Sequence, residues 1–466
     1  MTRCGLSADR LGRHVRGEAA AWSTLGRRDA ILAALALALV PKRGLALGRT
    51  ADGGSIAFHL PWPIASIDPH RIDDATAAIL GDSLFEPLYA VGEGGTTVPA
   101  LAEADPEPTS AGLRVAIRAG VRTARDRPLD ARDAAFSIAR ARSLGARGWL
   151  AEIPAPHLDG RDALVFSTHD AAKLVRALAS PLVAVVPTNF APDRPDGTGP
   201  FRADKRGDAL ALARNPRAAE GPSFLDEVVV RASADVADSL RAFESGQDSI
   251  GWLGSGLHEP RPGARPFDFG AVAWPILRTG REAAAWDAPG IAQRVADGIA
   301  YSRLAYLVLG APWPVQTEEA WGGAPCDLLV RDDAPWLVEL ARAVAATITR
   351  PSHEVNVRVI PAAEVAARRT SRAYSLMLDV ARPLAASPFG SFIGLATADD
   401  AQTVADIARH APRLVDTNPR TLTRTMRVGV LGEVRVQGAR AADVTLGATP
   451  SGGIDFGDAS RARRTP

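Results

Sequence analysis

The chain has 466 residues, which exceeds the roughly 250–300 residues that one hydrophobic core supports, so two or three lobes are expected. Hydrophobic residues make up 46% of the chain and charged residues 23%, which excludes a largely disordered chain and a polytopic membrane protein. The formal net charge is +1, and the sequence lacks the basic stripe that a nucleic-acid surface needs, so no nucleic-acid partner is expected.

The first 48 residues have the layout of a secretory signal. Arg27 and Arg28 precede an apolar run, Ala30–Val40, and a small-residue segment ends at Gly48. The run is shorter than the about 20 apolar residues that a spanning helix needs. The arginine pair resembles a twin-arginine export signal, while the ordinary secretory route and a buried N-terminal helix remain alternatives. The sequence therefore predicts export to the periplasm, with residues 1–48 as the signal peptide.

From residue 55 onward, β-rich runs alternate with amphipathic helical patterns, which predicts a mixed α/β fold. Asp130 stands in the N-cap position before the helical pattern Ala131–Arg142, and Asp133 and Arg140 are assigned to the exposed face of that helix. Predicted strands cover Ser55–Leu60, Leu113–Arg118, Leu164–Ser167, Val228–Arg231, Asp327–Val330, Val355–Ile360 and Tyr374–Val380, and further predicted helices cover Ala171–Ala179, Asp235–Ser245, Ala334–Thr349 and Ala362–Arg369. The turn-rich stretches Pro187–Gly199 and Gly254–Pro266 are the expected connections between lobes.

The sequence contains none of the common catalytic or metal-binding patterns. A Gly-x-Ser-x-Gly elbow, a Walker loop and a His-Glu-x-x-His motif are all missing. The two cysteines, Cys4 and Cys326, lie on opposite sides of the expected cleavage point, and no Cys/His cluster offers a zinc ligand set. We expect no catalytic residue, no cofactor and no metal site in the chain, and hence no enzyme.

Eight short blocks follow one another along the first half of the chain. They are Ser66–His70, Leu84–Tyr89, Val98–Ala102, Leu113–Val121 with Pro128–Ser137, Gly197–Phe201, Arg214–Pro216, Phe224–Val228 and Phe243–Asp248. The glycines of the fifth block, Gly197 and Gly199, are expected to form a turn with positive φ. The order of the blocks resembles extracellular solute-binding protein family 5, the dipeptide, oligopeptide and nickel receptors of ABC importers.

The resemblance implies a two-lobed fold of the periplasmic binding protein class, type II, of the large peptide-binding kind, with mixed sheets and a third small subdomain. In this scheme the chain enters lobe I, leaves it for the subdomain, returns, passes through lobe II and comes back to lobe I. The expected boundaries are 49–92 for the first part of lobe I, 93–187 for the subdomain, 188–272 for the second part of lobe I, 273–420 for lobe II and 421–466 for the return with a frayed tail.

The function implied is capture of a peptide or other small solute between the lobes and delivery to an ABC permease with its ATPase subunits. Peptide receptors of this family follow the strand near Tyr374 with a Trp and then an Asp that pairs with the peptide's α-ammonium group. Here the segment Leu378–Pro383 lacks the Trp, and Asp379 is displaced. A chelated metal remains open as a ligand, and a relative that has lost transport and serves as a sensor or interaction domain is the alternative function.

Candidate ligand contacts are aromatic platforms and charges near the expected lobe boundary. For each tryptophan, ordinary packing is the competing interpretation. For Asp379 and Arg382, the competing interpretation is a solvated ion pair of small energetic value. The candidates are Trp62, Gly197, Thr198, Gly199, Trp252, Trp274, Asp379 and Arg382.

Overall fold

The computed structural model describes residues 53–64, 66–92, 95–252, 261–300, 304, 319–385, 388–399 and 419–462. The predicted signal peptide, residues 1–48, lies outside these residues, as do residues 253–260 of the expected Gly254–Pro266 connection. Within the described ranges, no helix combines the length and the apolar character that crossing a bilayer requires.

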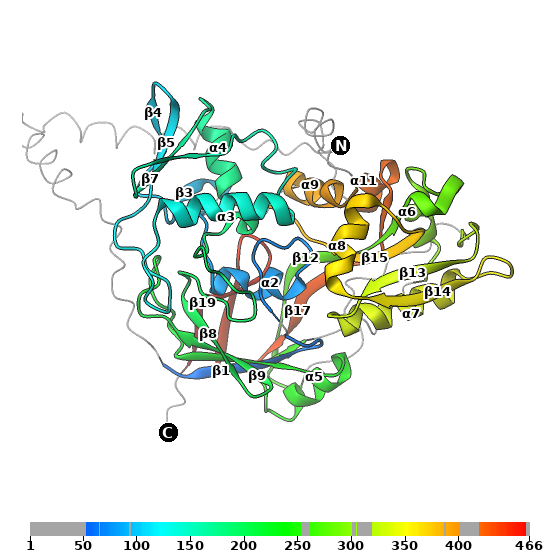
Figure 1. Cartoon of the computed structure of the whole chain (residues 1–466). Coiled ribbons are helices and arrows are strands. Elements are labelled where there is room, and N and C mark those ends of the chain that lie inside the picture. Colours follow the sequence, from blue (N-terminus) through cyan, green and yellow to red (C-terminus); the bar gives the residue numbers. More distant parts are fainter. Residues whose placement is uncertain are drawn as a thin grey trace, which may run out of the picture. The chain divides into compact units, whose positions relative to one another are not determined.

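The described residues form one mixed sheet of eleven strands, with three smaller sheets beside it (Figure 1). The large sheet has two parts, which we call the first and the second half-sheet. Strand order in the first half-sheet is β17 (Val434–Arg440), β11 (Ile250–Trp252), β1 (Ser55–Leu60), β10 (Glu227–Ala232), β9 (Ala209–Arg214) and β8 (Phe201–Arg206). The second half-sheet contains β15 (Leu376–Ala381), β13 (Cys326–Arg331), β14 (Val355–Ile360) and the short β16 (Val428–Val430).

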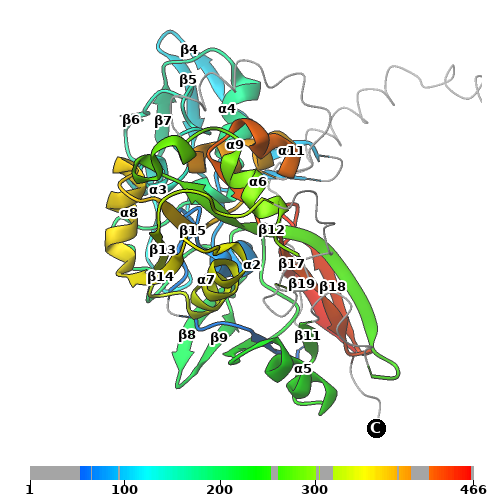
Figure 2. The ribbon, with the colours of Figure 1, turned by 90° about the vertical axis from the view of Figure 1, so that its right-hand side faces the viewer.

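The two half-sheets are joined by one long strand, β12 (Arg265–Thr279), which has 15 residues. Its N-terminal part pairs with β17 from Arg265 to Ala273, and its C-terminal part pairs with β15 from Trp274 to Thr279 (Figure 2). Register shifts interrupt the β17 pairing on either side of Ala271, and such irregularities bend a strand. The chain therefore passes between the half-sheets through β12 at this point.

Helix α7 (Pro335–Ile348) covers one face of the second half-sheet. Pro335 at the first helical turn is compatible with a helix start because proline lacks only an N–H that would have no partner there. The apolar side of α7 is buried, and the helix packs against β13 and β14. The residues buried along it are Trp336, Leu337, Val338, Leu340, Ala341, Val344, Ala345 and Ile348.

Other helices surround the sheet and its neighbouring segments. The first half-sheet has α2 (Ala75–Leu80), η1 (Gly81–Ser83) and α5 (Val236–Glu244) beside it. In the remaining part of the chain are η4 (Arg281–Trp286), α6 (Ile291–Asp297), α8 (Ala362–Ser371), α9 (Pro388–Asp399), α11 (Pro419–Leu422) and η7 (Thr423–Thr425). The hairpin β18 (Val444–Ala448) and β19 (Ile454–Arg461) ends the described chain.

A separate four-stranded sheet, in the order β4-β5-β7-β6, and two helices lie between residues 107 and 178. Helix α3 (Ala131–Leu144) starts at Asp130, whose carboxylate accepts the Arg132 N–H, while the Asp133 side chain accepts the Asp130 N–H. The strands of this sheet are β4 (Glu107–Thr109), β5 (Gly112–Ala116), β6 (His157–Asp159) and β7 (Ala163–Phe166). The second helix is α4 (Ala171–Leu178), and η3 (Pro181–Val183) follows α4. A hairpin of β2 (Tyr89–Val91) and β3 (Thr97–Pro99) precedes β4 in the chain.

The assignment of Asp133 and Arg140 to an exposed helix face is wrong. Asp133 is buried and accepts the Thr188 N–H as well as the Asp130 N–H. Arg140 donates two hydrogen bonds to the carboxylate of buried Asp68, at 2.7 and 2.6 Å. Helical periodicity alone could not reveal these contacts, because Thr188 and Asp68 lie in loops distant from α3 in the sequence.

The α3 cap provides a first testable prediction. Replacing Asp130 with alanine removes the acceptor of the Arg132 N–H at the helix start, and the free energy of unfolding is expected to fall by about 1 kcal/mol. The measurement is the Tm of the purified variant. Asp162→Ala, at an exposed position near the same sheet, serves as the control and is expected to leave the free energy of unfolding within about 0.5 kcal/mol. Equal Tm values for the two variants would contradict the role of the cap.

Candidate ligand-binding site

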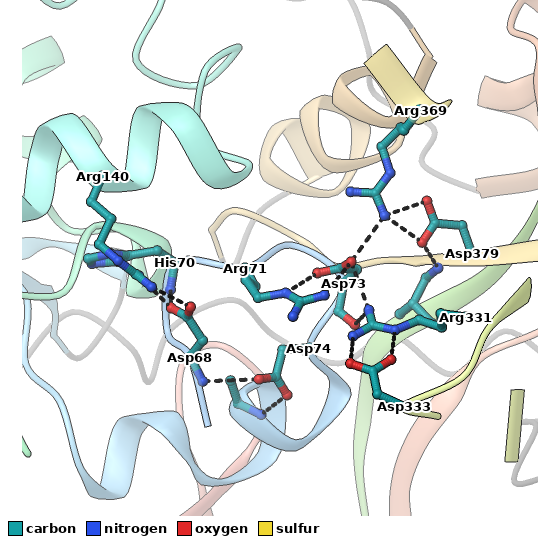
Figure 3. A network of polar contacts seen from close by, with 12 residues as sticks. Asp68, His70, Arg71, Asp73, Asp74, Arg140, Arg331, Asp333, Arg369 and Asp379 are labelled. Atoms are coloured by element: carbon teal, nitrogen blue, oxygen red, sulfur yellow. Dashed lines mark hydrogen bonds and ion pairs between the residues drawn. The ribbon is translucent and has the colours of Figure 1, made fainter. Parts of the chain in front are cut away.

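A buried group of charged side chains lies between α2 and the second half-sheet (Figure 3). At its centre is Asp73, in the loop that joins β1 to α2. Its carboxylate accepts hydrogen bonds from Arg71 at 2.9 and 3.0 Å, from Arg331 at 2.8 Å and from Arg369 at 3.0 Å. We call Arg71, Asp73, Arg331, Asp333, Arg369 and Asp379 the Asp73 cluster.

The Asp73 cluster connects segments that are far apart in the chain. Arg331 is the last residue of β13, and its guanidinium also binds Asp333. Arg369 lies on α8, and one of its nitrogens, Nη2, reaches both Asp73 and Asp379. Arg331 and Arg369 therefore hold the segment after β1, through Asp73, against the second half-sheet and α8.

The electrostatic state of Asp73 follows from its three partners. Burial alone would raise the pKa of Asp73, but the charges and hydrogen bonds of Arg369, Arg71 and Arg331 reverse this effect and hold the pKa below its ordinary value of 3.8. A group whose pKa is lowered by folding contributes stability that is present above its unfolded pKa and lost as pH falls below it. The Asp73 carboxyl is therefore charged throughout the neutral range.

Asp379 is held from two sides and does not pair with Arg382. It accepts a hydrogen bond from Arg278 on β12 at 2.9 Å and pairs with Arg369 at 2.9 Å. Asp379 and Arg382 are both buried. The interpretation of these two residues as a solvated ion pair is wrong.

A cavity of ≈ 50 Å³ lies beside the Asp73 cluster, lined by Trp62, Arg71, Asp73, Arg331, Trp336 and Val380 among others. Ligand pockets for small molecules usually have about 300–1,000 Å³. The space between α2 and the second half-sheet is thus too small for a peptide in the arrangement described.

A larger cavity of ≈ 430 Å³ lies over the first half-sheet, lined by Ile64, Ser66 and Ile67, by residues 192–195 and by the β8–β9 hairpin. It contains both charge signs, with Arg125, Arg194 and Lys205 opposite Asp204 and Asp208. Ser66 lines both cavities, so the segment after β1 borders both spaces.

Trp62 lies at the smaller cavity, and Trp252 lies behind it. The Trp62 indole N–H donates to Thr76 at 3.0 Å, and its ring contacts Trp252 edge-on and Trp336 at a tilt, with centroids 6.1 and 5.7 Å apart. Trp336 comes from α7, so the Trp62–Trp336 contact joins the two half-sheets. Trp252 is fully buried on β11.

The loop of Gly197, Thr198 and Gly199 lies against residues 83–85 and is not among the residues that line either cavity. The expectation of positive φ at Gly197 and Gly199 is wrong. Both glycines are instead required by close approach, since an added Cβ at Gly199 would lie 2.7 Å from the Leu84 carbonyl carbon.

His70 and Arg140 form a second polar group beside Asp68, visible at the left of Figure 3. His70 Nε2 lies 2.8 Å from the Ala184 carbonyl oxygen and Nδ1 lies 3.0 Å from Arg140, so Nε2 carries the proton and Nδ1 accepts. Burial lowers the pKa of His70 to about 4, which keeps the imidazole neutral. This group fixes the loop that carries Asp73.

Sequence reasoning missed the residues of the Asp73 cluster other than Asp379. Two signals were available: the acidic loop Asp68–Asp74 directly after a strand, and Arg331 at the carboxyl end of a predicted strand. Neither indicates which distant arginine meets which aspartate. Among the described side chains, no group of His, Cys, Asp and Glu is arranged to hold a metal ion.

Glu86 is a buried carboxyl whose Oε1 accepts the Glu220 N–H at 3.2 Å. Burial, and then the charge of Glu220, raise its pKa from 4.5 to about 8. When folding raises the pKa of a carboxyl, the protonated form is the one compatible with the folded state. The folded protein is therefore expected to lose stability as pH rises from 4.5 to 8, because Glu86 ionises more readily in the unfolded chain.

Glu86→Gln is expected to raise the free energy of unfolding at pH 8 by about 1–3 kcal/mol and to leave it nearly unchanged at pH 5, because the neutral amide needs no proton. The measurement is Tm across this pH range. A fall in Tm with pH that is equally steep in wild type and variant would show that Glu86 is not the titrating group.

The fold can be compared with solved structures. The chain is similar to a dipeptide-binding protein from Pseudoalteromonas sp. SM9913 in complex with Met-Leu, with a TM-score of 0.63 and 13% identity over 88% of this chain and 100% of that chain. It is similar to the oligopeptide-binding protein AppA from Bacillus subtilis in complex with a nonapeptide, with a TM-score of 0.62 and 12% identity over 89% and 100%.

A third similar structure is NikA from Staphylococcus aureus in complex with Ni(L-His)2, with a TM-score of 0.60 and 16% identity over 86% of this chain and 98% of that chain. No protein-family model and no curated protein sequence matches the chain. At identities this low, the likeness demonstrates a shared fold. The chain has the two-lobed, mixed α/β periplasmic-binding-protein fold that the resemblance to extracellular solute-binding protein family 5 predicts.

Proposed function

We propose that the protein is an exported solute-binding protein that captures a peptide or peptide-like solute between two lobes and delivers it to an ABC importer. The observation that carries the proposal is the Asp73 cluster, where Arg331 of β13 and Arg369 of α8 bind a carboxylate in the segment after β1. These contacts exist only when the half-sheets meet, as closure around a ligand requires. The proposed role involves no chemistry on the solute.

In this proposal the lobes follow the chain as the sequence predicts. Lobe I consists of residues 49–92, 188–272 and 421–466, lobe II consists of residues 273–420, and residues 93–187 form the small subdomain. The passage of β12 from β17 to β15 between Ala273 and Trp274 supports a hinge at this point. A few residues at such crossings are sufficient to absorb a hinge rotation.

The similar proteins support a solute as ligand without selecting one. Their complexes hold a nonapeptide, the dipeptide Met-Leu and Ni(L-His)2. For this chain we propose a periplasmic location, reached through the predicted signal peptide, and an ABC permease with its ATPase subunits as partners.

The alternative is a protein that keeps the scaffold but has lost transport and acts as a sensor or interaction domain. The observation that favours it is the cavity of ≈ 50 Å³, around which the half-sheets already meet. A transporter receptor has to open this arrangement before a solute enters, whereas an interaction domain has no such need.

Mass spectrometry of the protein purified from its own periplasm tests the proposal. A bound solute, released on denaturation, is the expected result, and the same compound is expected to raise the Tm of the refolded protein. A panel of peptides, sugars and metal chelates extends the search by thermal shift. If no compound is released and none raises the Tm, the capture function is wrong and the interaction domain is favoured.

A further inference from the structure

Asp74 lies where the two half-sheets meet. It is the N-cap of α2, next to Asp73, and it lines the cavity of ≈ 50 Å³ beside the Asp73 cluster (Figure 3). On the side of the second half-sheet, the same cavity is lined by the apolar side chains of Ala334, Leu337 and Val380. Separation of the half-sheets would replace this apolar wall with water.

The hydrogen bonds of the Asp74 carboxylate are local. One oxygen, Oδ1, accepts the Ala77 N–H at 2.8 Å, and the other, Oδ2, accepts the Asp68 N–H at 3.0 Å. The arginines nearby bind Asp73 instead, and among the described residues no cation forms an ion pair with Asp74. Both donors belong to the segment after β1, so separation of the half-sheets removes the burial of Asp74 but not its hydrogen bonds.

The charged groups around Asp74 have settled charge states in weak acid. Arginine stays protonated in proteins, so its guanidinium remains charged. Burial opposes the ionisation of Asp73 and Asp333, but their arginine partners outweigh it and hold the pKa of each below 3.8. Both oxygens of Asp68 bind Arg140, and His70 is neutral above a pKa of about 4. The groups are Asp68, His70, Arg71 and Asp73 in the same loop, Arg331 and Asp333 at the end of β13, Arg369 on α8 and Arg382 after β15.

Asp74 itself has a pKa in the weakly acidic range. Burial raises its pKa from 3.8 to about 6, because the two backbone hydrogen bonds and the charges of Arg71 and Arg382 only partly offset the lost hydration. When the half-sheets separate, the hydration returns while the hydrogen bonds stay, so the pKa falls back toward 3.8. The closed arrangement, in which the half-sheets meet, therefore holds the Asp74 proton more tightly than the open one.

A group whose pKa is raised in one arrangement favours that arrangement below its lower pKa and loses this effect as pH rises through the higher one. We propose that closure of the half-sheets is linked to the uptake of one proton by Asp74, so that weak acid favours the closed arrangement. This inference rests on the proposed function and adds a proton as a regulator of the contact between the half-sheets. The ionised carboxylate opposes closure at neutral pH.

Distances between spin labels at different pH values test the proton link. The labels are placed at the exposed positions Arg241 on α5 and Arg342 on α7, in a chain with Cys4→Ser and Cys326→Ser and without solute. The shorter distances belong to the closed arrangement. With pKa values of 3.8 and about 6, lowering the pH from 7.5 to 5 is expected to raise the closed-to-open ratio about tenfold.

Asp74→Asn removes the titrating group and keeps a residue that caps helices well. Any hydrogen bond that asparagine loses to Asp68 or Ala77 is lost in both arrangements, because both donors move with it. At pH 7.5 its closed-to-open ratio is expected to exceed the wild-type ratio by on the order of 100-fold, and it should not change with pH. Asp170→Asn, at the exposed N-cap of α4, is the matched control and keeps the wild-type pH response.

Two results overturn the proton link directly. One is a wild-type ratio that stays constant between pH 7.5 and 5, and the other is an Asp74→Asn chain that keeps the pH response. A single distance in every sample overturns it as well, because no opening then exists for a proton to control. Asp74→Ser, a neutral residue that also caps helices, takes the place of Asp74→Asn if that variant does not fold.

Failure of this inference is distinguishable from failure of the proposed function. A distance that shortens with the solute released from the native protein, but is the same at pH 5 and 7.5, contradicts the proton link and leaves solute capture intact. A distance that responds to neither the solute nor the pH contradicts both.

Discussion

Asp73→Ala is expected to lower the free energy of unfolding by about 3–5 kcal/mol, the range for removing one partner of a buried ion pair. Arg331 and Arg369 retain Asp333 and Asp379, but both lose the carboxylate that links them to the segment after β1. Arg71 loses its carboxylate partner. The variant therefore loses the ion pairs of Arg331 and Arg369 with Asp73, which join the half-sheets beside the Trp62–Trp336 contact.

The measurement is denaturant unfolding at neutral pH, where Asp73 is charged in the wild-type chain. Glu339→Gln on the exposed face of α7 breaks the Glu339–Arg342 ion pair and serves as the control. Its free energy of unfolding is expected to change by less than about 0.5 kcal/mol, because exposed pairs contribute little. An Asp73→Ala variant as stable as this control would refute the role assigned to the Asp73 cluster.

Gly197→Ala is the second substitution with a large expected effect. The added Cβ would overlap the Leu84 carbonyl oxygen and lie 2.6 Å from a ring carbon of Phe85. The Leu84 oxygen accepts the Gly199 N–H, so backbone must shift on both sides of the contact. The free energy of unfolding is expected to fall by about 3 kcal/mol, at the upper end for overpacking.

Gly81→Ala is the matched control for this clash. Gly81 begins η1 with helical backbone angles, and an added Cβ there meets nothing within 4 Å. Alanine at such a position is neutral or stabilises by about 0.4–1 kcal/mol, because it restricts the unfolded chain. If Gly197→Ala melts at the same temperature as Gly81→Ala, residues 197–199 do not approach residues 83–85 as closely as described.

Local elements of this fold were predictable because their signals are local. Strands β1 and β14 have the predicted bounds, and Asp130 caps its helix as predicted, while Asp235, predicted as the first residue of its helix, is the N-cap. Asp126 adopts a left-handed φ of 68°, in agreement with the tolerance of aspartate for that conformation. Helix caps and turns of this kind depend on hydrogen bonds between residues close in the sequence, so both partners can be read from one short stretch.

Contacts between distant segments were not predictable in the same way. The long strand β12 changes partner from β17 to β15 in mid-course, which no periodicity of its own residues encodes. Arg369 appears in the sequence as the end of an amphipathic helix, yet it binds Asp73 across 296 positions. Trp62 and Arg382 were selected for their chemistry, but only the structure shows that Trp62 lines a cavity and that Arg382 Nη1 is buried without a hydrogen-bond partner among the described residues.

The central claim is that the two half-sheets separate and close around a solute. Spin labels at exposed positions Arg241 on α5 and Arg342 on α7, in a chain with Cys4→Ser and Cys326→Ser, report the distance between them. We expect a broad distance distribution without solute, a shorter and narrower one with the solute identified by mass spectrometry, and a longer one in Asp73→Ala. One unchanged distance in all three samples would contradict the account.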